Sequence, residues 1–385
     1  MLSVALYIFW ISAVILGYTY LGYPILIALL ARLNPKKISG GGDPKLPQVS
    51  LIVAAHNEEK VIREKITNSL AIDYPEGLLL VVIVSDGSVD RTNEIINEFA
   101  SRSGIKFIHY QPRRGKAHAL NLGVANSESE IIVFSDANIH YEPDSIKMLV
   151  RNFSDPSIGC VCGKVLLEKP KDSKEPIGEG AYMKYERFIH QNESRFNIMI
   201  GTDGAMYAIR RELFSPLPED AIVDDFTIAM RVIEKRYRIV YEPKAIGYEE
   251  AASSVGQEFK RKVRMIAGGF QAIGILGNVL NPLNHPIVYF QFVSHKLLRW
   301  LAPIFMLGVF VTNLFLLFSH FYQLILFAQL VFYSIAIIAA LQENLRKRAL
   351  FYFPYYFCSL NIAAGIGIKR FILGQQTVKW DKISR

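Results

Sequence analysis

The sequence predicts a chain of the α/β class, in which a mostly parallel, doubly wound sheet is attached to transmembrane helices. Two observations support this prediction. Between residues 48 and 153, short apolar runs alternate with amphipathic helical patterns, as in successive βαβ units. At both ends of the sequence, the chain carries uncharged apolar runs that are too long for ordinary core helices. The formal net charge of +8 is concentrated beside these runs, so nucleic acid is not an expected partner.

The apolar runs predict the membrane segments. Residues 1–33 form an N-terminal transmembrane helix, because residues 2–31 carry no charge and, at about 1.5 Å per residue, exceed the ~30 Å hydrocarbon core. This run lacks the basic start and the cleavage pattern of a signal peptide. A C-terminal transmembrane region is expected at 286–373, with spans at about 300–319 and 321–342 and a further apolar run at 349–368.

Basic flanks predict the orientation. Arg32 and Lys36 follow the first span, and Arg346-Lys-Arg348 precedes the last run, so both clusters are expected in the cytoplasm. If residues 349–368 crossed fully, the basic tail at 374–385 would lie outside, against the same rule. That run is therefore either a full span or an interfacial or re-entrant helix. A linker at 34–47 and a domain at 48–285 are expected in the cytosol of a multi-pass protein of the cell (inner or plasma) membrane.

The elements of the cytosolic domain follow from its periodicity. Aliphatic runs predict buried strands, and apolar residues at helical spacing predict the helices between them. Cys160 and Cys162 alternate along one strand, so we expect both thiols on one face, packed in the core. Strands are expected at 48–55, 79–84, 105–110, 131–135, 158–167 and 205–209; helices are expected at 61–70, 91–99, 117–125, 178–196, from 224 onward, and at 257–270, where the pattern is basic and amphipathic.

Carboxylates follow several of these elements. Asp86 ends the second strand, Asp136 ends the fourth, and Asp224 and Asp225 open a later helix. Open α/β sheets bind their ligands at the carboxyl ends of their strands. One such carboxylate alone would more often cap a turn, but three positions in one α/β pattern favour a site for a metal and a nucleotide-sugar.

Five ordered motifs carry a resemblance to a known family: Ala54-Ala-His-Asn-Glu58, Ser85-Asp-Gly-Ser-Val-Asp90, Gly115-Lys-Ala-His-Ala-Leu-Asn121, Ser135-Asp-Ala-Asn138 and Val223-Asp-Asp-Phe226. Through them, residues 48–270 resemble the processive-type membrane family 2 glycosyltransferases, which include cellulose, chitin, hyaluronan and poly-N-acetylglucosamine synthases. The resemblance implies a GT-A fold, a UDP-sugar donor, a divalent metal (Mn²⁺ or Mg²⁺) and inversion at the anomeric carbon.

The resemblance also implies a set of donor and metal residues. Asp136 and Asn138 match the family's D-x-D metal motif, and two oxygen ligands at a strand end suit a hard cation. Because Asn138 replaces the second Asp, the site has one charge fewer, and the choice between Mn²⁺ and Mg²⁺ stays open. Lys116 would contact a phosphate oxygen, or else lie in solvent at a helix start. The expected donor-binding residues are Ala54, Asn57, Glu58, Asp86, Lys116, Asp136 and Arg261.

The catalytic assignments rest on two further motifs. Asp225 matches the last residue of the family's T-E-D motif, with Asp224 in place of Glu, and would take the acceptor's proton. Paired carboxylates repel, which raises a pKa, although the same pair would also serve as a helix cap. Of the Q-x-x-R-W signature only Arg264 fits, since Arg261 replaces Gln and Met265 replaces Trp.

Arg264 and Arg261 would then neutralise the departing diphosphate. The alternative for their segment is a basic amphipathic helix that rests on anionic membrane lipid. Asp203 and Gly204 lie where the family places residues that face the acceptor.

Several functions remain open from the sequence. The motif order favours transfer to a polysaccharide or oligosaccharide, and this is the function that we expect. The few spans and the missing tryptophan favour the alternative, a single transfer to a lipid acceptor, as in ceramide glucosyltransferase-like or polyprenyl-phosphate enzymes. A non-catalytic nucleotide-binding subunit of a synthase complex, or an enzyme that needs a partner subunit, are further alternatives. A nucleotidyltransferase is disfavoured, because the first strand is not followed by a glycine-rich basic loop.

Overall fold

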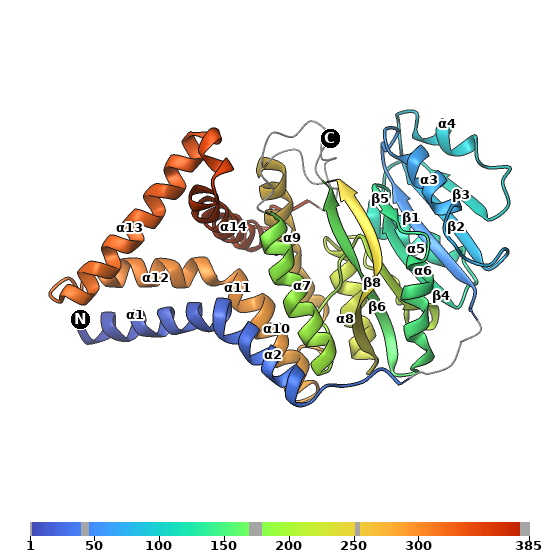
Figure 1. Cartoon of the computed structure of the whole chain (residues 1–385). Helices are drawn as coiled ribbons and strands as arrows, with labels where there is room; N and C mark the ends of the chain where they lie inside the picture. The colour runs from blue at the N-terminus through green and yellow to red at the C-terminus, as the bar shows by residue number, and fades with distance from the viewer. Residues whose placement is uncertain (1, 40–45, 169–178, 251–254, 378–385) are drawn as a thin grey trace.

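The computed structural model describes residues 2–39, 46–168, 179–250 and 255–377. The chain folds into an α/β domain attached to a group of apolar helices that extends away from it (Figure 1). Parts of two predicted segments, residues 40–45 of the linker and 378–385 of the tail, lie outside the described residues.

An eight-stranded sheet forms the centre of the domain, in the order β3-β2-β1-β4-β7-β6-β8-β5. The four strands β3, β2, β1 and β4 run parallel, as predicted, because a helix connects each strand to the next. Strand β7 is antiparallel to both β4 and β6, β8 returns parallel to β6, and β5 pairs antiparallel with β8, so the sheet as a whole is mixed. The strands are β1 (Val49–Ala55), β2 (Leu79–Asp86), β3 (Ile105–Tyr110), β4 (Ile131–Asp136), β5 (Ile139–Tyr141), β6 (Ile158–Glu168), β7 (Met206–Arg210) and β8 (Arg238–Glu250).

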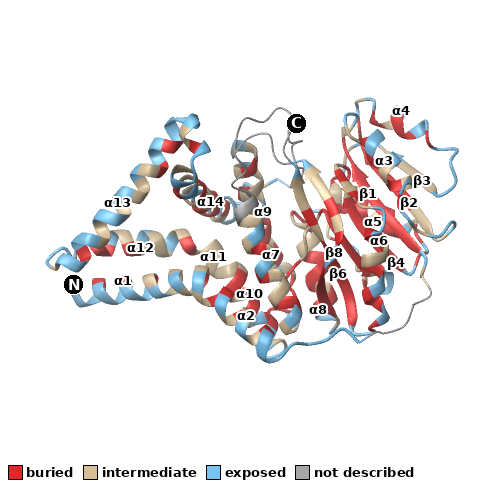
Figure 2. Ribbon diagram, viewed as in Figure 1, coloured by how far each residue is buried: buried red, intermediate tan, exposed pale blue. Residues whose placement is uncertain are grey.

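Helices cover both faces of this sheet and create two hydrophobic cores. Successive side chains of a strand point to opposite faces, so Ile52 packs in one core and Leu51 in the other. Figure 2 shows the strands largely buried. The domain helices are α3 (Ile62–Leu70), α4 (Thr92–Asn97), α5 (Lys116–Ala125), α6 (Ser145–Val150), α7 (Glu179–Phe196), α8 (Asp224–Glu234) and α9 (Val255–Ile275), with 3₁₀ turns η2 (Arg151–Ser154) and η3 (Arg211–Leu213).

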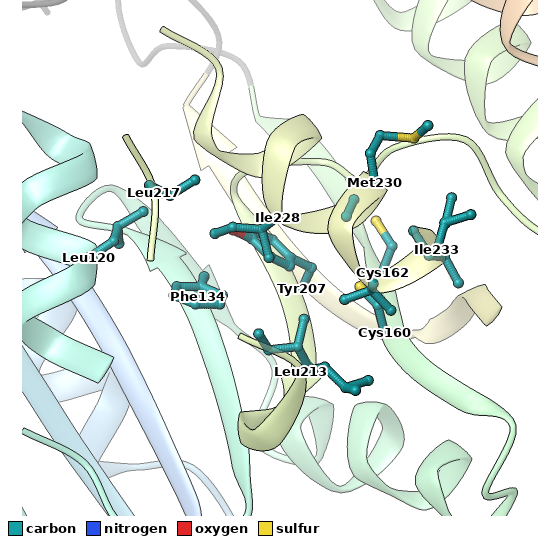
Figure 3. Packing of buried hydrophobic residues seen from close by; sticks show 14 of the residues in the cluster. Leu120, Phe134, Cys160, Cys162, Tyr207, Leu213, Leu217, Ile228, Met230 and Ile233 are labelled. Carbon is teal, nitrogen blue, oxygen red and sulfur yellow. The ribbon is translucent and has the colours of Figure 1, made fainter. Parts of the chain in front are cut away.

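Both cysteines of β6 lie in the core beneath α8. Cys160 and Cys162 are fully buried beside Tyr207 and Ile228 (Figure 3). Their shared face and their packing role agree with the sequence prediction, and both thiols are free.

Strand β8 is an element that the sequence pattern did not indicate. After its first four residues it contains Glu242, Pro243, Lys244 and Glu249, so no continuous apolar run marks it. The strand is held by long parallel pairing to β6, with register shifts that accommodate the irregular residues. The short strand β5 and helix α6 were missed as well, since each is too short to show a period.

The apolar helices include three that are long and apolar enough to cross a membrane: Leu2–Leu33, His320–Leu341 and Ala349–Ile372. The predicted span at 300–319 is instead part of a bent pair, Pro286–Trp300 and Ala302–Leu314, with 58° between its arms. Pro303 lies at the start of the second arm, where it lacks the N–H that would continue the helix. These segments are α1 (Leu2–Gly17), η1 (Tyr18–Gly22), α2 (Tyr23–Leu33), α10 (Pro286–Phe292), η4 (Val293–Leu297), α11 (Leu298–Trp300), α12 (Ala302–Leu314), α13 (His320–Leu341), η5 (Glu343–Lys347) and α14 (Ala349–Ile372).

Candidate active site

The turns after β1 and β2 are tied to each other at the carboxyl edge of the sheet. Asn57 adopts a left-handed conformation (φ 55°), and its side-chain Oδ1 accepts a hydrogen bond from Val89 N at 2.9 Å. Glu58 N donates to Thr92 Oγ1 at 2.7 Å. Ala54 lies in register with Asp136 on the neighbouring strand. The sheet therefore brings Ala54, Asn57, Glu58 and Asp136 to one edge, as the motif order predicted.

Asp86 is fully buried and binds the loop that leads into α5. Its carboxylate accepts hydrogen bonds from Tyr110 Oη (2.9 Å), Arg114 N (2.7 Å) and Gly115 N (2.9 Å). The adjacent Gly87 has φ 59°, and a Cβ there would lie 2.6 Å from Arg113 N, so only glycine fits. In this structure Asp86 thus shapes the loop that positions Lys116, while its contact with a donor stays a prediction.

Lys116 lies between carboxylates that come from two elements. Its Nζ is 2.8 Å from Asp136 Oδ1 at the end of β4 and 3.3 Å from Asp224 Oδ2 at the start of α8. Burial alone would lower the pKa of Lys116, but the charges of Asp136, Asp224 and Asp225 raise it overall. The ammonium group marks a position where the fold gathers negative charge around a cation.

Asp225 lies beside this cluster in the first turn of α8. Its Oδ1 accepts a hydrogen bond from Phe226 N at 2.8 Å, and a Cβ on Gly204 would approach Oδ2 to 2.9 Å. Burial, followed by repulsion from Asp224, raises the pKa of Asp225 to about 7, although the charge of Lys116 opposes the shift. A carboxylate with such a pKa can accept a proton near neutral pH.

The residues predicted to face the acceptor lie next to Asp225. A Cβ on Gly204 would collide with its carboxylate, as described above, and Asp203 is held by one hydrogen bond to strand β6 and one within its own turn. Asp203 N donates to Cys162 Sγ at 3.2 Å, and Asp203 Oδ1 accepts from Ala205 N at 3.3 Å. Burial raises the pKa of the Asp203 carboxyl.

A residue without any motif joins the site from β8. Asn138 Nδ2 donates to Glu249 Oε1 at 3.1 Å, because β5 and β8 pair in register at Ile139 and Glu249. Burial raises the pKa of Glu249 to about 7, and Arg261 partly offsets that shift. Asn138 occupies the position of the second acid of the D-x-D motif, and Glu249 places a carboxyl group beside it. Only the strand pairing reveals it.

The two arginines of α9 have different surroundings. Arg264 Nη2 donates to Ile222 O at 3.1 Å, in the loop just before the Asp224–Asp225 pair. Burial lowers the pKa of Arg264, and the charges of Asp224 and Asp225 act in the opposite direction. Arg261 instead forms a 2.7 Å ion pair with Glu258 one turn earlier on its own helix. The structure therefore brings Arg264 to the carboxylate pair, whereas Arg261 is held by a neighbour.

A cavity of about 810 Å³ begins at Asp225 and extends toward the apolar helices. Met265 lines it, at the position where the family signature has tryptophan, and so does Trp300 from α11. Trp300 packs closely against Gly269 of α9. An indole is thus present in the cavity, supplied by a residue 35 positions later in the chain. No periodic signal in the sequence could have placed it there.

Comparison with known proteins assigns the domain. Residues 50–217 match the family model described as Glycosyl transferase family 2. The chain contains a family 2 glycosyltransferase domain. The predicted family 2 domain is thereby confirmed over residues 50–217, which include the strand-end carboxylates Asp86 and Asp136.

Curated relatives share this domain. The chain is 24% identical over 270 residues to a poly-beta-1,6-N-acetyl-D-glucosamine synthase of Staphylococcus epidermidis. The matched region covers 69% of this chain and 63% of that protein. It is 29% identical over 293 residues to the Bacillus subtilis protein named "Probable glycosyltransferase YdaM", covering 70% of this chain and 67% of that one. The chain thus spans less than two thirds of the length of the staphylococcal synthase.

A solved structure shows the same fold over nearly the whole chain. It is the mannosyltransferase PcManGT from Pyrobaculum calidifontis, in complex with GDP-Man and Mn²⁺. The TM-score is 0.70 with 21% sequence identity, and the match covers 96% of this chain and 99% of that one. The structural similarity therefore includes the apolar helices as well as the glycosyltransferase domain.

Proposed function

We propose that this chain is an inverting glycosyltransferase that moves a sugar from a nucleoside diphosphate donor, expected to be UDP, to an acceptor hydroxyl at the membrane. One observation carries the proposal: Asp136, Asp224 and Asp225 gather around Lys116 Nζ, and Asp225 also lines a large cavity. A sugar-nucleotide transferase needs this combination of a charged diphosphate site and a base at the acceptor entrance.

In the proposed reaction the acceptor oxygen attacks the anomeric carbon directly. The bond from that carbon to the diphosphate oxygen breaks with its electron pair on the diphosphate, and Asp225 receives the acceptor's proton. One displacement without an enzyme nucleophile inverts the anomeric configuration. Arg264, placed before the carboxylate pair, neutralises the departing diphosphate.

A divalent cation fits the oxygen-rich donor set. Asp136 and Asn138 offer hard oxygen ligands. Asp224 Oδ2 is a buried oxygen that pairs with Lys116 and accepts no hydrogen bond from the described residues, so it is a third candidate ligand. When bound, Mn²⁺ or Mg²⁺ would supply positive charge to the diphosphate. Lys116 would then contact a phosphate oxygen, and Ala54, Asn57, Glu58 and Asp86 would line the nucleotide side. Arg261, which pairs with Glu258, would lie at the edge of the donor site.

We also propose a cytoplasmic glycosyltransferase domain with α14 lying along the membrane surface. In Figure 1, α1 and α12 run side by side across the view, whereas α14 is seen nearly end-on. Gly367 of α14 packs against Val263 and Ile266 of α9, which belongs to the glycosyltransferase domain. An interfacial α14 keeps Arg346, in η5 just before the helix, and Lys369, in its last turn, on the same side of the membrane, which satisfies the positive-inside rule.

A panel of donors tests the proposal. The full chain, purified in detergent with Mn²⁺, is mixed with UDP- and GDP-sugars and assayed for release of the nucleoside diphosphate. We expect release from one donor, abolished by EDTA and reduced at low metal concentration in Asp136→Asn. Binding of nucleotide without release from any donor, in the presence of membrane lipid, would instead support the non-catalytic subunit.

A further inference from the structure

Helix α3 carries a lysine in the middle of its buried face. Lys65 lies between Ile62 and Ile66, which both pack in a hydrophobic core, and only 1% of Lys65 is exposed. An apolar residue normally fills such a position, because an amine that leaves water loses free energy unless hydrogen bonds replace the water. The proposed reaction gives Lys65 no role, so its contacts inside the domain indicate what the amine does.

The amine of Lys65 connects the two ends of the turn between β4 and β5. Its Nζ donates to Ser135 Oγ, near the end of β4, and to Ile139 O, at the start of β5, both at 2.7 Å. Ser135 Oγ in turn donates to Asp136 O at 3.1 Å. The residues between these two anchors, 136–138, include both oxygen ligands expected for the metal. Lys65 therefore links the backbone on either side of the candidate metal site.

Hydrogen bonds, rather than charge, are the constant feature of this contact. The partners of Lys65 are uncharged: a hydroxyl, a backbone carbonyl and the ring of Tyr141, whose centre lies 4.4 Å from Nζ. Burial lowers the pKa of Lys65 to about 7, although the charge of Asp136 opposes the shift. An ammonium group has three N–H donors and a neutral amine has two, so both forms can serve the two acceptors.

The other polar contacts of the turn are made by its ligand side chains. Lys116 pairs with the carboxylate of Asp136, and Glu249 accepts a hydrogen bond from Asn138 Nδ2. Both contacts involve groups that would also bind the metal, so they change when it binds. Lys65 instead binds a hydroxyl and a carbonyl that are not expected ligands. It can therefore hold the turn in one place before and after metal binding.

We propose that Lys65 is a positioning residue, which fixes the turn at 136–138 so that Asp136 and Asn138 present their oxygens to one divalent cation. This inference rests on the proposed function and deepens its metal site. Loss of a group that holds metal ligands in place typically lowers metal affinity by about 10–100-fold. Because Lys65 acts through the ends of the turn and not on a ligand atom, we expect an effect at the lower end of this range.

Asn68, three residues later on α3, provides a matched control. Helix α3 packs against β5 (Figure 1). Asn68 Nδ2 donates to Tyr141 O at 2.9 Å, and Asn68 Oδ1 accepts from Tyr141 N at 2.8 Å. Asn68 thus makes two hydrogen bonds to this segment, as Lys65 does, but its partner is the last residue of β5, beyond the turn. Replacing Asn68 should loosen the same packing without releasing the turn.

The effect of Mn²⁺ on nucleotide binding tests the inference without an activity assay. Isothermal titration of the full chain in detergent gives the Kd of UDP, or of GDP if GDP binds more tightly, once with Mn²⁺ and once with EDTA. The ratio of the two values measures the gain in affinity from the metal, and the value in EDTA reports on the rest of the donor site. In the parent chain we expect Mn²⁺ to tighten binding, and Asp136→Asn to remove most of that gain.

Variants connect the gain from Mn²⁺ to Lys65. Lys65→Met should reduce it by about tenfold and leave the Kd in EDTA within about twofold of the parent value. Asn68→Ala should lower the thermal midpoint, as Lys65→Met does, yet keep the full gain. Ser135→Ala removes one of the two acceptors, so it should cause a smaller loss, and it should add little to the loss in Lys65→Met because both act through one contact. Ser135→Ala also decides the matter if Lys65→Met does not fold.

The outcomes separate this inference from the proposed function. A gain from Mn²⁺ in Lys65→Met equal to that of the parent would leave Lys65 a role in core packing alone, and a larger gain would show that its charge repels the metal. Either result would overturn the inference, as would an equal loss in Asn68→Ala, because general loosening of β5 would then explain both variants. If Mn²⁺ does not tighten nucleotide binding even in the parent chain, the metal-dependent reaction itself is refuted, and the role of Lys65 with it.

Discussion

The strand-end site and the junction between the domain and the apolar helices are both buried and charged, yet their charges are balanced differently. At the strand ends, three carboxylates lie around the ammonium of Lys116, with the Arg264 guanidinium near the Asp224–Asp225 pair, and Asp224 repels Asp225. At the junction, Glu193 accepts hydrogen bonds from Tyr23 Oη (2.5 Å) and Ile200 N (3.2 Å), and contacts His295 Nδ1 at 2.9 Å. Carboxylates that repel one another raise a pKa and suit a site that binds a cation or accepts a proton. Removing one partner of the junction instead leaves buried polar groups unpaired, which costs stability.

The largest effect is expected at the unbalanced site. Asp225→Asn keeps an oxygen that can accept from Phe226 N but removes the base, so turnover should fall by about 10²–10⁴-fold. The folded pKa of about 7 lies above the ordinary value near 4, so ionisation of Asp225 destabilises the fold progressively as pH rises from about 4 through 7. At pH 8 the thermal midpoint of the variant should therefore be no lower than that of the parent.

Nucleotide release and thermal unfolding measured on the same preparations decide this prediction. Turnover in Asp225→Asn within tenfold of the parent would show that the base lies elsewhere. A clear fall in the thermal midpoint would show that Asp225 serves the fold rather than the reaction.

The junction should respond in the opposite way. Glu193→Ala leaves the Tyr23 hydroxyl and the His295 ring buried without their common partner, which should lower the free energy of unfolding by about 3 kcal/mol. Thermal unfolding of the detergent-purified chain should show a midpoint several degrees lower. Glu98→Ala, which removes an exposed ion pair with Arg63, is the matched control and should leave the midpoint unchanged. Equal shifts in the two variants would contradict the comparison.

The same contrast explains what the sequence could predict. The strand-end residues Asp86, Lys116 and Asp136 lie within local motifs, each next to a strand or a helix whose period is visible, and parallel strands bring such ends together. The fold class and the alternation of the first four strands with their connecting helices followed from these signals, and the location of the site at the strand ends stays a prediction. The family match over residues 50–217 agrees with that part of the prediction.

The remainder depends on contacts between distant segments. Glu249 reaches Asn138 through a strand with no apolar period, and Trp300 enters the cavity from beyond the domain boundary. Tyr23 and Glu193 are 170 positions apart, and their hydrogen bond forms only once α2 and α7 pack together. The bend near Pro303 was likewise not predicted, because hydropathy measures composition and not helix continuity. Such features require tertiary geometry.

The smallest expected effect is a shift in the pH dependence of kcat when Lys116 of the strand-end site is replaced. Because Asp225 acts as a base and its pKa is about 7, kcat should rise as pH increases through about 7. Lys116 lowers the pKa of Asp225, so Lys116→Met should move this rise to higher pH by about one unit and reduce kcat at neutral pH. The pH profile of kcat at saturating donor measures the shift.

Lys147→Met provides the control for that profile, since Lys147 forms an ion pair with Asp73 at the surface and lies outside the strand-end site. Its profile should coincide with that of the parent. If Lys116→Met lowers kcat equally at every pH, then Lys116 acts on the donor phosphate alone and does not set the pKa of the base. If the profile moves to lower pH, the charge of Lys116 does not lower the pKa of Asp225 once donor is bound. The charge imbalance that distinguishes this site from the junction would then be absent in the donor complex.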